Sequence, residues 1–197
     1  IQDSVRFSTL VGNYYNLPVI NNAESGGSNS RIVRTTTQDI IDLKSQGKTP
    51  FVIIAWTAHH RFEVCNESHE WIQFNAGRDS KDPDFENMYW KKYGDDLGNI
   101  ETFAVQVMLM QKFLESYNIP YLMLHAFNPV VIPRKHKLAD FADNLDYRYF
   151  LPDLPLRGYL TQWPDIKFGL GGHPLEEGHK KISEFLIQLI DNRYAFS

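Results

Sequence analysis

The fold is decided by the run Phe51–Trp56, FVIIAW, which leads directly into the polar stretch TAHHRFE at 57–63. A run this short with no charged residue is typical of a strand, and it is apolar enough to be buried on both faces of a parallel sheet. Two further short runs, Pro18–Asn22 (PVINN) and Tyr121–Phe127 (YLMLHAF), have flanks that carry Gly, Pro and Asn. The sequence therefore predicts three buried strands.

Helical periodicity separates these strands. In residues 176–192 apolar side chains recur every three or four positions, and Pro174 stands just before the first turn. Residues 101–117 are apolar over most of a helical circumference, which is typical of a helix covered on most sides. The predicted helices are 4–16, 36–45, 101–117 and 176–192.

Alternating helices and strands indicate an α/β sheet with helices on both faces. The sequence therefore predicts one domain over 1–197, a three-layer α/β/α sandwich around a mostly parallel, flavodoxin-like sheet. Such folds normally begin with a strand, whereas this chain begins with a helix, so we expect a first central strand to be missing from the sequence. Long loop insertions are expected at about 58–98 and 128–172, after strand ends where open α/β sheets place ligands.

Composition excludes several classes of protein. The 197 residues, 43% hydrophobic and 22% charged, do not fit a disordered tail, a collagen-like fibre or a coiled coil. A net charge of −4 argues against a nucleic-acid partner. The chain has no run of about 18 apolar residues, so the sequence predicts no membrane span. The single cysteine, Cys65, excludes an internal disulfide and a multi-cysteine zinc site, and leaves the compartment open.

A Gly/Ser-rich turn, NNAESGGSNSRI at 21–32, follows the first predicted strand and precedes a predicted helix. Glycine lets a backbone N–H approach a ligand closely, and a helix N-terminus favours negative charge. The turn is therefore a candidate cradle for an oxyanion or a phosphate, although no Gly-Lys-Ser/Thr follows as in a P-loop. The alternative is an ordinary loop that caps a helix through Ser28 or Asn29.

Histidines mark the other candidate positions. His173 follows Gly171-Gly172 and stands just before the predicted helix 176–192, where it could act as a general base or serve as a surface or capping residue. His179 falls inside that helix and is expected to be structural.

The stretch 56–63 places hydroxyl, imidazole, guanidinium and carboxylate groups after a strand. Its spacing matches no standard metal site, so we expect no metal and no other cofactor. The candidate substrate-binding residues are Ser28, Asn29, His59 and Arg61.

Together these segments resemble, in order and spacing, the SGNH/GDSL hydrolase family, and most closely the SGNH-like proteins of tailed phages. The segment 22–29 resembles the family's second block, whose oxyanion-hole glycine falls on Gly27. The segment 51–58 resembles the third block, whose oxyanion asparagine falls on Thr57. The segment 173–179 resembles the fifth block, with His173 as catalytic base.

The sequence also departs from the family's pattern. The nucleophile block, Gly-Asp-Ser, is not found. Asp3-Ser4 looks similar, but Ser4 opens a predicted helix and fits an N-cap better than a nucleophile. The family's aspartate, three residues before the base, is here Leu170, with Asp165 as a candidate replacement. The resemblance therefore implies a nucleophilic serine upstream of Ile1 if the protein is an active enzyme.

The resemblance implies hydrolysis of an acyl or acetyl ester, with carbohydrate esters among the expected substrates. The alternative is a catalytically inactive SGNH-like binding or structural module with virion or homo-oligomer partners. A third reading is a flavodoxin-like binder of nucleotides or small anions, which leaves the segment around His173 without a role. Aromatic residues of the insertions could stack on sugars or form satellite cores. They are Trp71, Tyr89, Trp90, Tyr93, Tyr147, Tyr149, Tyr159 and Trp163.

Overall fold

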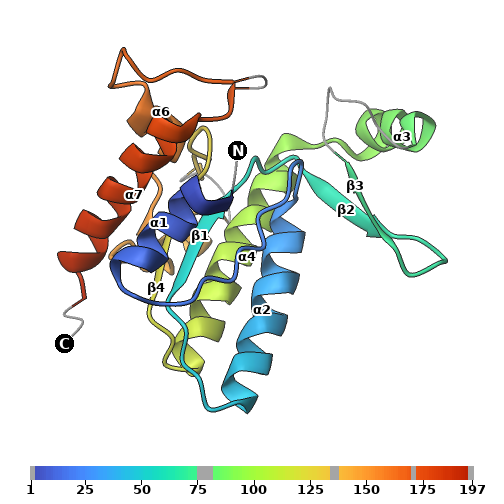
Figure 1. Cartoon of the computed structure of the whole chain (residues 1–197). Coiled ribbons are helices and arrows are strands. Elements are labelled where there is room, and N and C mark those ends of the chain that lie inside the picture. The colour runs from blue at the N-terminus through green and yellow to red at the C-terminus, as the bar shows by residue number, and fades with distance from the viewer. Residues whose placement is uncertain (1–2, 75–81, 134–137, 170–171, 195–197) are drawn as a thin grey trace. The chain divides into compact units, whose positions relative to one another are not determined.

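The computed structural model of the chain describes residues 3–74, 82–133, 138–169 and 172–194 (Figure 1). The chain divides into two compact units, which we call the terminal unit and the central unit. The terminal unit is Ile1–Asn21 together with Leu154–Ser197, and the central unit is Asn22–Asp153. The single domain expected over 1–197 stays a prediction.

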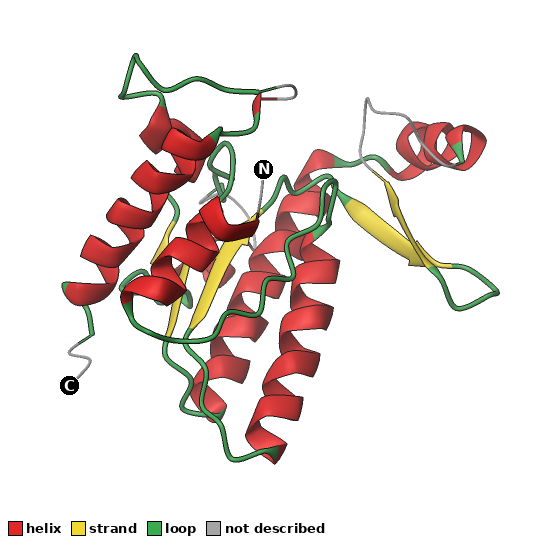
Figure 2. Cartoon of the chain, viewed as in Figure 1, coloured by secondary structure: helices red, strands yellow, loops and turns green. Residues whose placement is uncertain are grey.

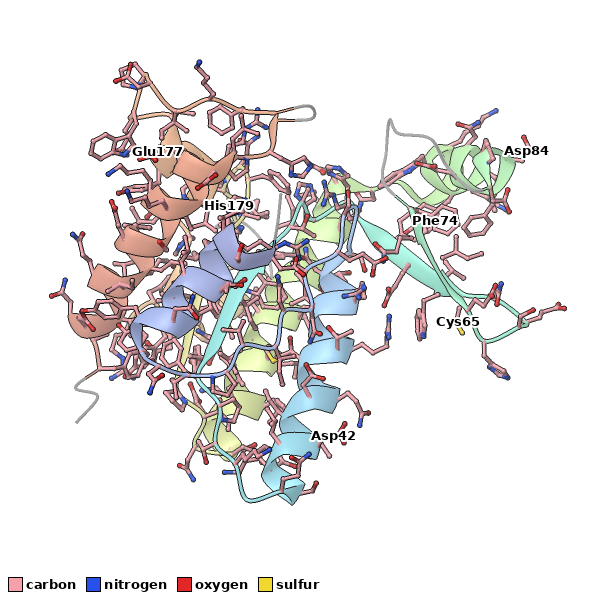
Figure 3. All side chains as sticks on the ribbon, viewed as in Figure 1. Asp42, Cys65, Phe74, Asp84, Glu177 and His179 are labelled. Carbon is pink, nitrogen blue, oxygen red and sulfur yellow. The ribbon has the colours of Figure 1, made fainter. Side chains whose placement is uncertain are left out.

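The terminal unit is helical. It contains the 3₁₀ turn η1 (Asp3–Val5) and the helices α1 (Phe7–Tyr14), α6 (Leu156–Leu160) and α7 (Glu176–Asp191). Helices α1 and α7 pack against each other through Phe7 and His179, whose rings stack at 5.7 Å (Figure 3 labels His179). The Phe7 N–H also donates to Nδ1 of His179 at 3.2 Å. The helix predicted at 176–192 and the structural role of His179 are both confirmed.

The strand predicted at Pro18–Asn22 is wrong, because these residues form no strand. The chain turns back along α1 at this point, and the Leu17 N–H donates to the Gly12 carbonyl oxygen at 2.9 Å. Val19 packs so closely on Gly12 that a Cβ there would lie 2.1 Å from the valine Cγ2. The apolar side chains of this run are used against a helix or left exposed, as Ile20 is at 60%.

The central unit contains a parallel three-stranded sheet in the order β1-β4-β5 (strands yellow in Figure 2). The strands are β1 (Val52–Trp56), β4 (Tyr121–His125) and β5 (Phe150–Leu151). Trp56 pairs with His125 at the carboxyl ends of β1 and β4, and every residue of β4 is buried. The α/β class and the two strands predicted at 51–56 and 121–127 are confirmed.

Two long helices, α2 (Asn29–Ser45) and α4 (Asp96–Ser116), lie side by side in the central unit (Figure 1). The ring of Phe103 on α4 meets that of Trp56 on β1 edge-on at 5.8 Å. These helices and strands share one hydrophobic core, so the helix predicted at 101–117 is confirmed. Helix α2 begins seven residues before its predicted start at 36, because Ser28 caps it.

The first expected insertion folds into a hairpin of β2 (Phe62–Cys65) and β3 (Trp71–Phe74), followed by helix α3 (Pro83–Tyr93). Its rings pack on one another: Phe62 lies 4.1 Å from Tyr89 and 4.9 Å from Phe74. These aromatics therefore form a satellite core. Trp71 is 45% exposed and lies under the Arg34 guanidinium at 4.3 Å.

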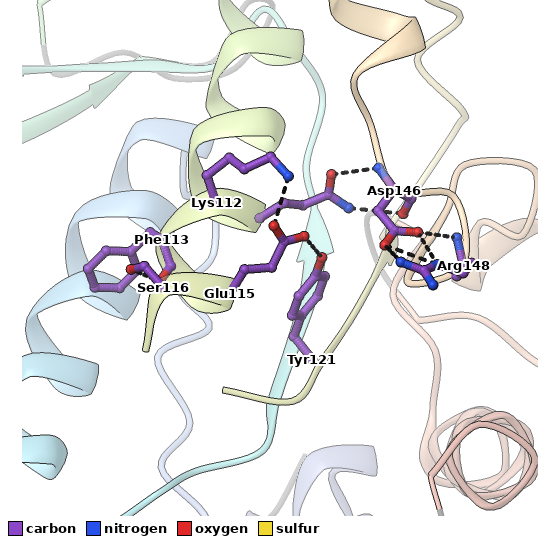
Figure 4. A network of polar contacts seen from close by, with 8 residues as sticks. Lys112, Phe113, Glu115, Ser116, Tyr121, Asp146 and Arg148 are labelled. Carbon is purple, nitrogen blue, oxygen red and sulfur yellow. Dashed lines mark hydrogen bonds and ion pairs between the residues drawn. The ribbon is translucent and has the colours of Figure 1, made fainter. Parts of the chain in front are cut away.

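The second expected insertion holds α5 (Leu138–Asp143), β5 and α6. The turn before β5 is tied to α4, because the Gln111 side chain donates to the Asp146 carbonyl and accepts from the Asp146 N–H, both at 3.0 Å (Figure 4). Hydrogen bonds from the Arg148 guanidinium lower the pKa of the Asp146 carboxyl. On the same helix, Glu115 accepts from the Tyr121 hydroxyl at 3.2 Å. Strand β5, only two residues long, is thus placed by tertiary contacts.

Candidate functional site

The end of strand β1 is joined to the start of helix α2 by one buried side chain. Asn29, 2% exposed, donates from Nδ2 to the Thr57 carbonyl oxygen at 3.3 Å. Its Oδ1 accepts from the Thr57 N–H at 2.9 Å. We call this arrangement the Asn29–Thr57 corner. It brings together two of the segments that the sequence singled out, 22–29 and 51–58.

Ser28 is the N-cap of α2, as the capping alternative for this turn predicts. Its Oγ accepts from the Arg31 N–H at 3.0 Å. The next two amides, of Asn29 and Ser30, have no hydrogen-bond partner among the described residues. Unpaired amides at a helix start favour negative charge nearby.

Replacing Ser28 with alanine is expected to lower the free energy of unfolding by about 1 kcal/mol, because the Arg31 N–H then loses its acceptor. Urea denaturation of the two proteins measures the difference. The matched control is Ser28→Thr, which keeps a hydroxyl at this extended position and is expected to lose less. Equal losses in both variants would contradict a capping role.

Polar groups of the loop before Ser28 are paired with one another and with Arg31. The Gly27 N–H donates to the Glu24 carbonyl oxygen at 3.1 Å, and Gly26 has φ of 82°, which favours glycine. Arg31 holds the loop through Glu24 at 2.7 Å and the Asn22 carbonyl at 2.8 Å. The N–H that the family resemblance assigns to an oxyanion is thus already paired inside the loop.

Thr57 offers a different donor. Thr57 is buried, and its Oγ1 has no hydrogen-bond partner among the described residues. Leaving a buried polar group unpaired costs about 1–3 kcal/mol. An acceptor oxygen that met this hydroxyl would recover part of that cost.

A histidine–carboxylate pair lies just beyond the corner. His59 Nε2 is 2.6 Å from Asp96 Oδ1, and Asp96 is the first residue of α4. The side chain of Asp95 caps the same helix by accepting from the Leu97 and Gly98 amides. The sequence singled out His59 but not Asp96, which is 37 residues away. The Asp95-Asp96 pair before an apolar helix is the signal that could have indicated it.

His60 and Arg61 complete this edge. The His60 ring lies edge-on to the rings of His59 at 5.6 Å and Trp90 at 6.2 Å. Burial lowers the pKa of His60, and the neighbouring His59 and Arg61 lower it further, so this imidazole is neutral at pH 7. The Arg61 guanidinium lies 5.1 Å from the ring of Phe127, just past the end of β4.

His173 belongs to the terminal unit. It is exposed and precedes α7 on a loop where Gly172 has φ of 73°, as the sequence predicts. Its carbonyl accepts from the Gly169 N–H at 2.8 Å. Among the described residues no carboxylate, Asp165 included, forms an ion pair with its ring, and Leu170 lies outside the described residues. Gly27, Thr57, His59 and Arg61 all belong to the central unit.

The N-cap role predicted for Ser4 is wrong. Ser4 is an exposed residue in the middle of η1, and the N-cap position of α1 is taken by Arg6. The helix begins at Phe7, because a 3₁₀ turn replaces its predicted first turn.

The described residues contain no group of three or more His, Cys, Asp or Glu side chains arranged to hold a metal ion. None of the helices in the described part of the chain is long and apolar enough to span a membrane.

Comparisons with known proteins relate the chain to a protein family. No curated protein and no solved structure matches the chain. A family model described as a family of unknown function, DUF6071, matches residues 8–147, a range that includes Asn29, Thr57, His59 and Asp96. Because the match spans more than half of the chain, the protein belongs to the DUF6071 family.

Proposed function

We propose that the protein is an SGNH/GDSL-type hydrolase of acyl or acetyl esters on a three-layer α/β/α scaffold. The Asn29–Thr57 corner carries this proposal. It joins the segments that resemble the second and third family blocks, at the carboxyl end of a parallel strand. The Thr57 hydroxyl and the first two amides of α2 are donors without partners among the described residues. Donors held in place in this way can stabilise the oxyanion of an acyl-transfer reaction.

Each residue then has a role. Thr57 and the Asn29 and Ser30 amides, which follow the Gly27 turn, form the oxyanion side, and His173 is the base that the resemblance assigns. Ser28 and Asn29 position this side, because their side chains are used in the helix cap and in the contact with Thr57. His59 and Arg61 lie at the same edge and face the substrate, for which a carbohydrate ester is one candidate class.

Fluorophosphonate labelling of the full-length product, with the modified peptide located by mass spectrometry, tests this function. A labelled serine is expected, with the label lost in His173→Ala. Hydrolysis of phenyl acetate is expected to fall about 10²-fold in Thr57→Val, which loses one oxyanion donor. Thr57→Ser keeps the hydroxyl and is the matched control. A folded protein with neither label nor turnover would overturn the proposal.

A catalytically inactive binding or structural module is the second candidate. It is favoured by the Gly27 N–H, which is paired with Glu24, and by the exposed His173 without a carboxylate in the described part of the chain. In that case the labelling and turnover experiments give nothing. Sedimentation would then be the next measurement, because a virion component or homo-oligomer is expected to assemble.

A further inference from the structure

The His59–Asp96 pair is not a feature that the family resemblance assigns, and its geometry is that of a general base. We propose that this pair activates a water molecule for attack on the carbonyl carbon of an ester held at the Asn29–Thr57 corner. The inference rests on the proposed function for its substrate class, but it needs no serine nucleophile.

The hydrogen bond to Asp96 decides which nitrogen of His59 can act. An ionised carboxylate only accepts hydrogen bonds, so Nε2 carries the proton in the 2.6 Å contact. In the neutral imidazole the other nitrogen, Nδ1, then keeps its lone pair, and it has no hydrogen-bond partner among the described residues. The His59 side chain is 21% exposed, so water can reach it.

Asp96 is well placed to orient the imidazole. It stands in the first turn of α4, where backbone amides make a favourable environment for a carboxylate. Its side chain is 78% exposed. Solvent therefore weakens the pair compared with a buried one, and the expected effect of removing Asp96 is correspondingly modest.

The pair and the corner belong to the same unit and the same edge of the sheet. His59 follows Thr57 by two residues, in a turn closed by a hydrogen bond from the Arg61 N–H to the Ala58 carbonyl at 3.2 Å. The carboxyl ends of parallel strands are where open α/β sheets bind ligands.

The reaction balances without a further reagent. His59 Nδ1 takes one proton from water while the water oxygen bonds to the ester carbonyl carbon. The carbonyl electron pair moves to its oxygen, where the Thr57 hydroxyl and the α2 amides are the donors. When the tetrahedral intermediate collapses, the bond to the alcohol oxygen breaks. His59 returns its proton to that oxygen, so one acid and one alcohol form.

Steady-state hydrolysis of phenyl acetate by the full-length protein tests the inference. His59→Gln is expected to lower kcat about 10²-fold, the lower range for a lost general base. Asp96→Asn is expected to lower kcat about 10-fold with KM unchanged, because substrate binding does not use the carboxylate. Asp96→Glu keeps an acceptor and is expected to restore most of the rate.

Two matched controls use residues outside the site. His69→Asn changes an exposed histidine of the β2–β3 turn, at φ of 61° where asparagine is tolerated, and Asp84→Asn changes an exposed carboxylate in the first turn of α3. Both are expected to match the unmodified protein. Thermal unfolding checks that each variant is folded. If His59→Gln does not fold, Asp96→Asn provides the test.

The outcomes separate this inference from the proposed function. Turnover that needs a labelled serine and His173, but is unchanged in His59→Gln and Asp96→Asn, overturns the inference alone. Turnover that falls in both variants without any fluorophosphonate label supports it and removes the serine mechanism. No turnover by any folded protein overturns both.

Discussion

Acidification from pH 7 to pH 4 is expected to lower the free energy of unfolding by about 3 kcal/mol through His125 alone, at about 1.36 kcal/mol per pKa unit. His125 is the last residue of β4 and is fully buried. Burial lowers its pKa from 6.5 to about 4, and the Asp153 charge opposes this only in part. Its ring lies 5.5 Å from those of Phe103 and Phe150.

The direction of this pH effect follows from the protonation of His125 in the folded and the unfolded chain. Below pH 6.5 His125 of the unfolded chain binds a proton, whereas the folded chain keeps it neutral down to about pH 4. The stabilisation is therefore complete above pH 6.5 and is lost as the pH falls through that range to about 4.

Urea denaturation at pH 7, 5.5 and 4 measures this effect in the unmodified protein and in His125→Phe. The variant also loses the acceptor for the Val130 N–H, a contact of 3.4 Å, but that cost is the same at every pH. The pKa of His179 is also lowered by burial, but that residue is present in both proteins, so the difference between the curves isolates His125. Parallel curves would show that His125 is not the titrating group.

Asn29→Ala is expected to lower the free energy of unfolding by about 2–4 kcal/mol, because it leaves two buried backbone groups of Thr57 without partners. Each unpaired group costs about 1–3 kcal/mol, and water cannot readily reach this buried position. The same variant is expected to reduce ester hydrolysis, since Thr57 is no longer held.

Chemical denaturation gives the stability difference, and Asn29→Asp is the matched control. Aspartate keeps an acceptor for the Thr57 N–H but no donor for its carbonyl, so an intermediate loss is expected. A loss below about 1 kcal/mol in Asn29→Ala would mean that the corner relaxes around other partners.

The elements that could be predicted from the sequence are those with a local pattern. The two long strands lie within Phe51–Trp56 and Tyr121–Phe127, because burial on both faces requires a continuous apolar run. Helix α7 lies within 176–192, because burial on one face of a helix requires apolar residues every three or four positions. The run Pro18–Asn22 has a similar composition but forms no strand, and its Val19 packs on Gly12 of α1. Composition alone does not distinguish these two outcomes.

The short elements had no such pattern. Strand β5 has two residues, and the contacts of Gln111 with Asp146 place the turn before it. The β2–β3 hairpin is held by rings that meet across strands and from α3. Interactions between distant residues decide such elements, so local periodicity does not indicate them.

The sequence by itself determined the α/β class and the position of the polar stretch at 57–63 after a strand. It left open whether the turn at 21–32 caps a helix, and whether Ser28 or Asn29 does so. Only the tertiary structure decided that Asn29 holds Thr57, 28 residues away, and that His59 meets Asp96, 37 residues away. The physical reason is the range of the forces that act along the chain. Caps and apolar periods act within one or two helical turns, whereas these side chains meet only after strand β1 and helices α2 and α4 have packed.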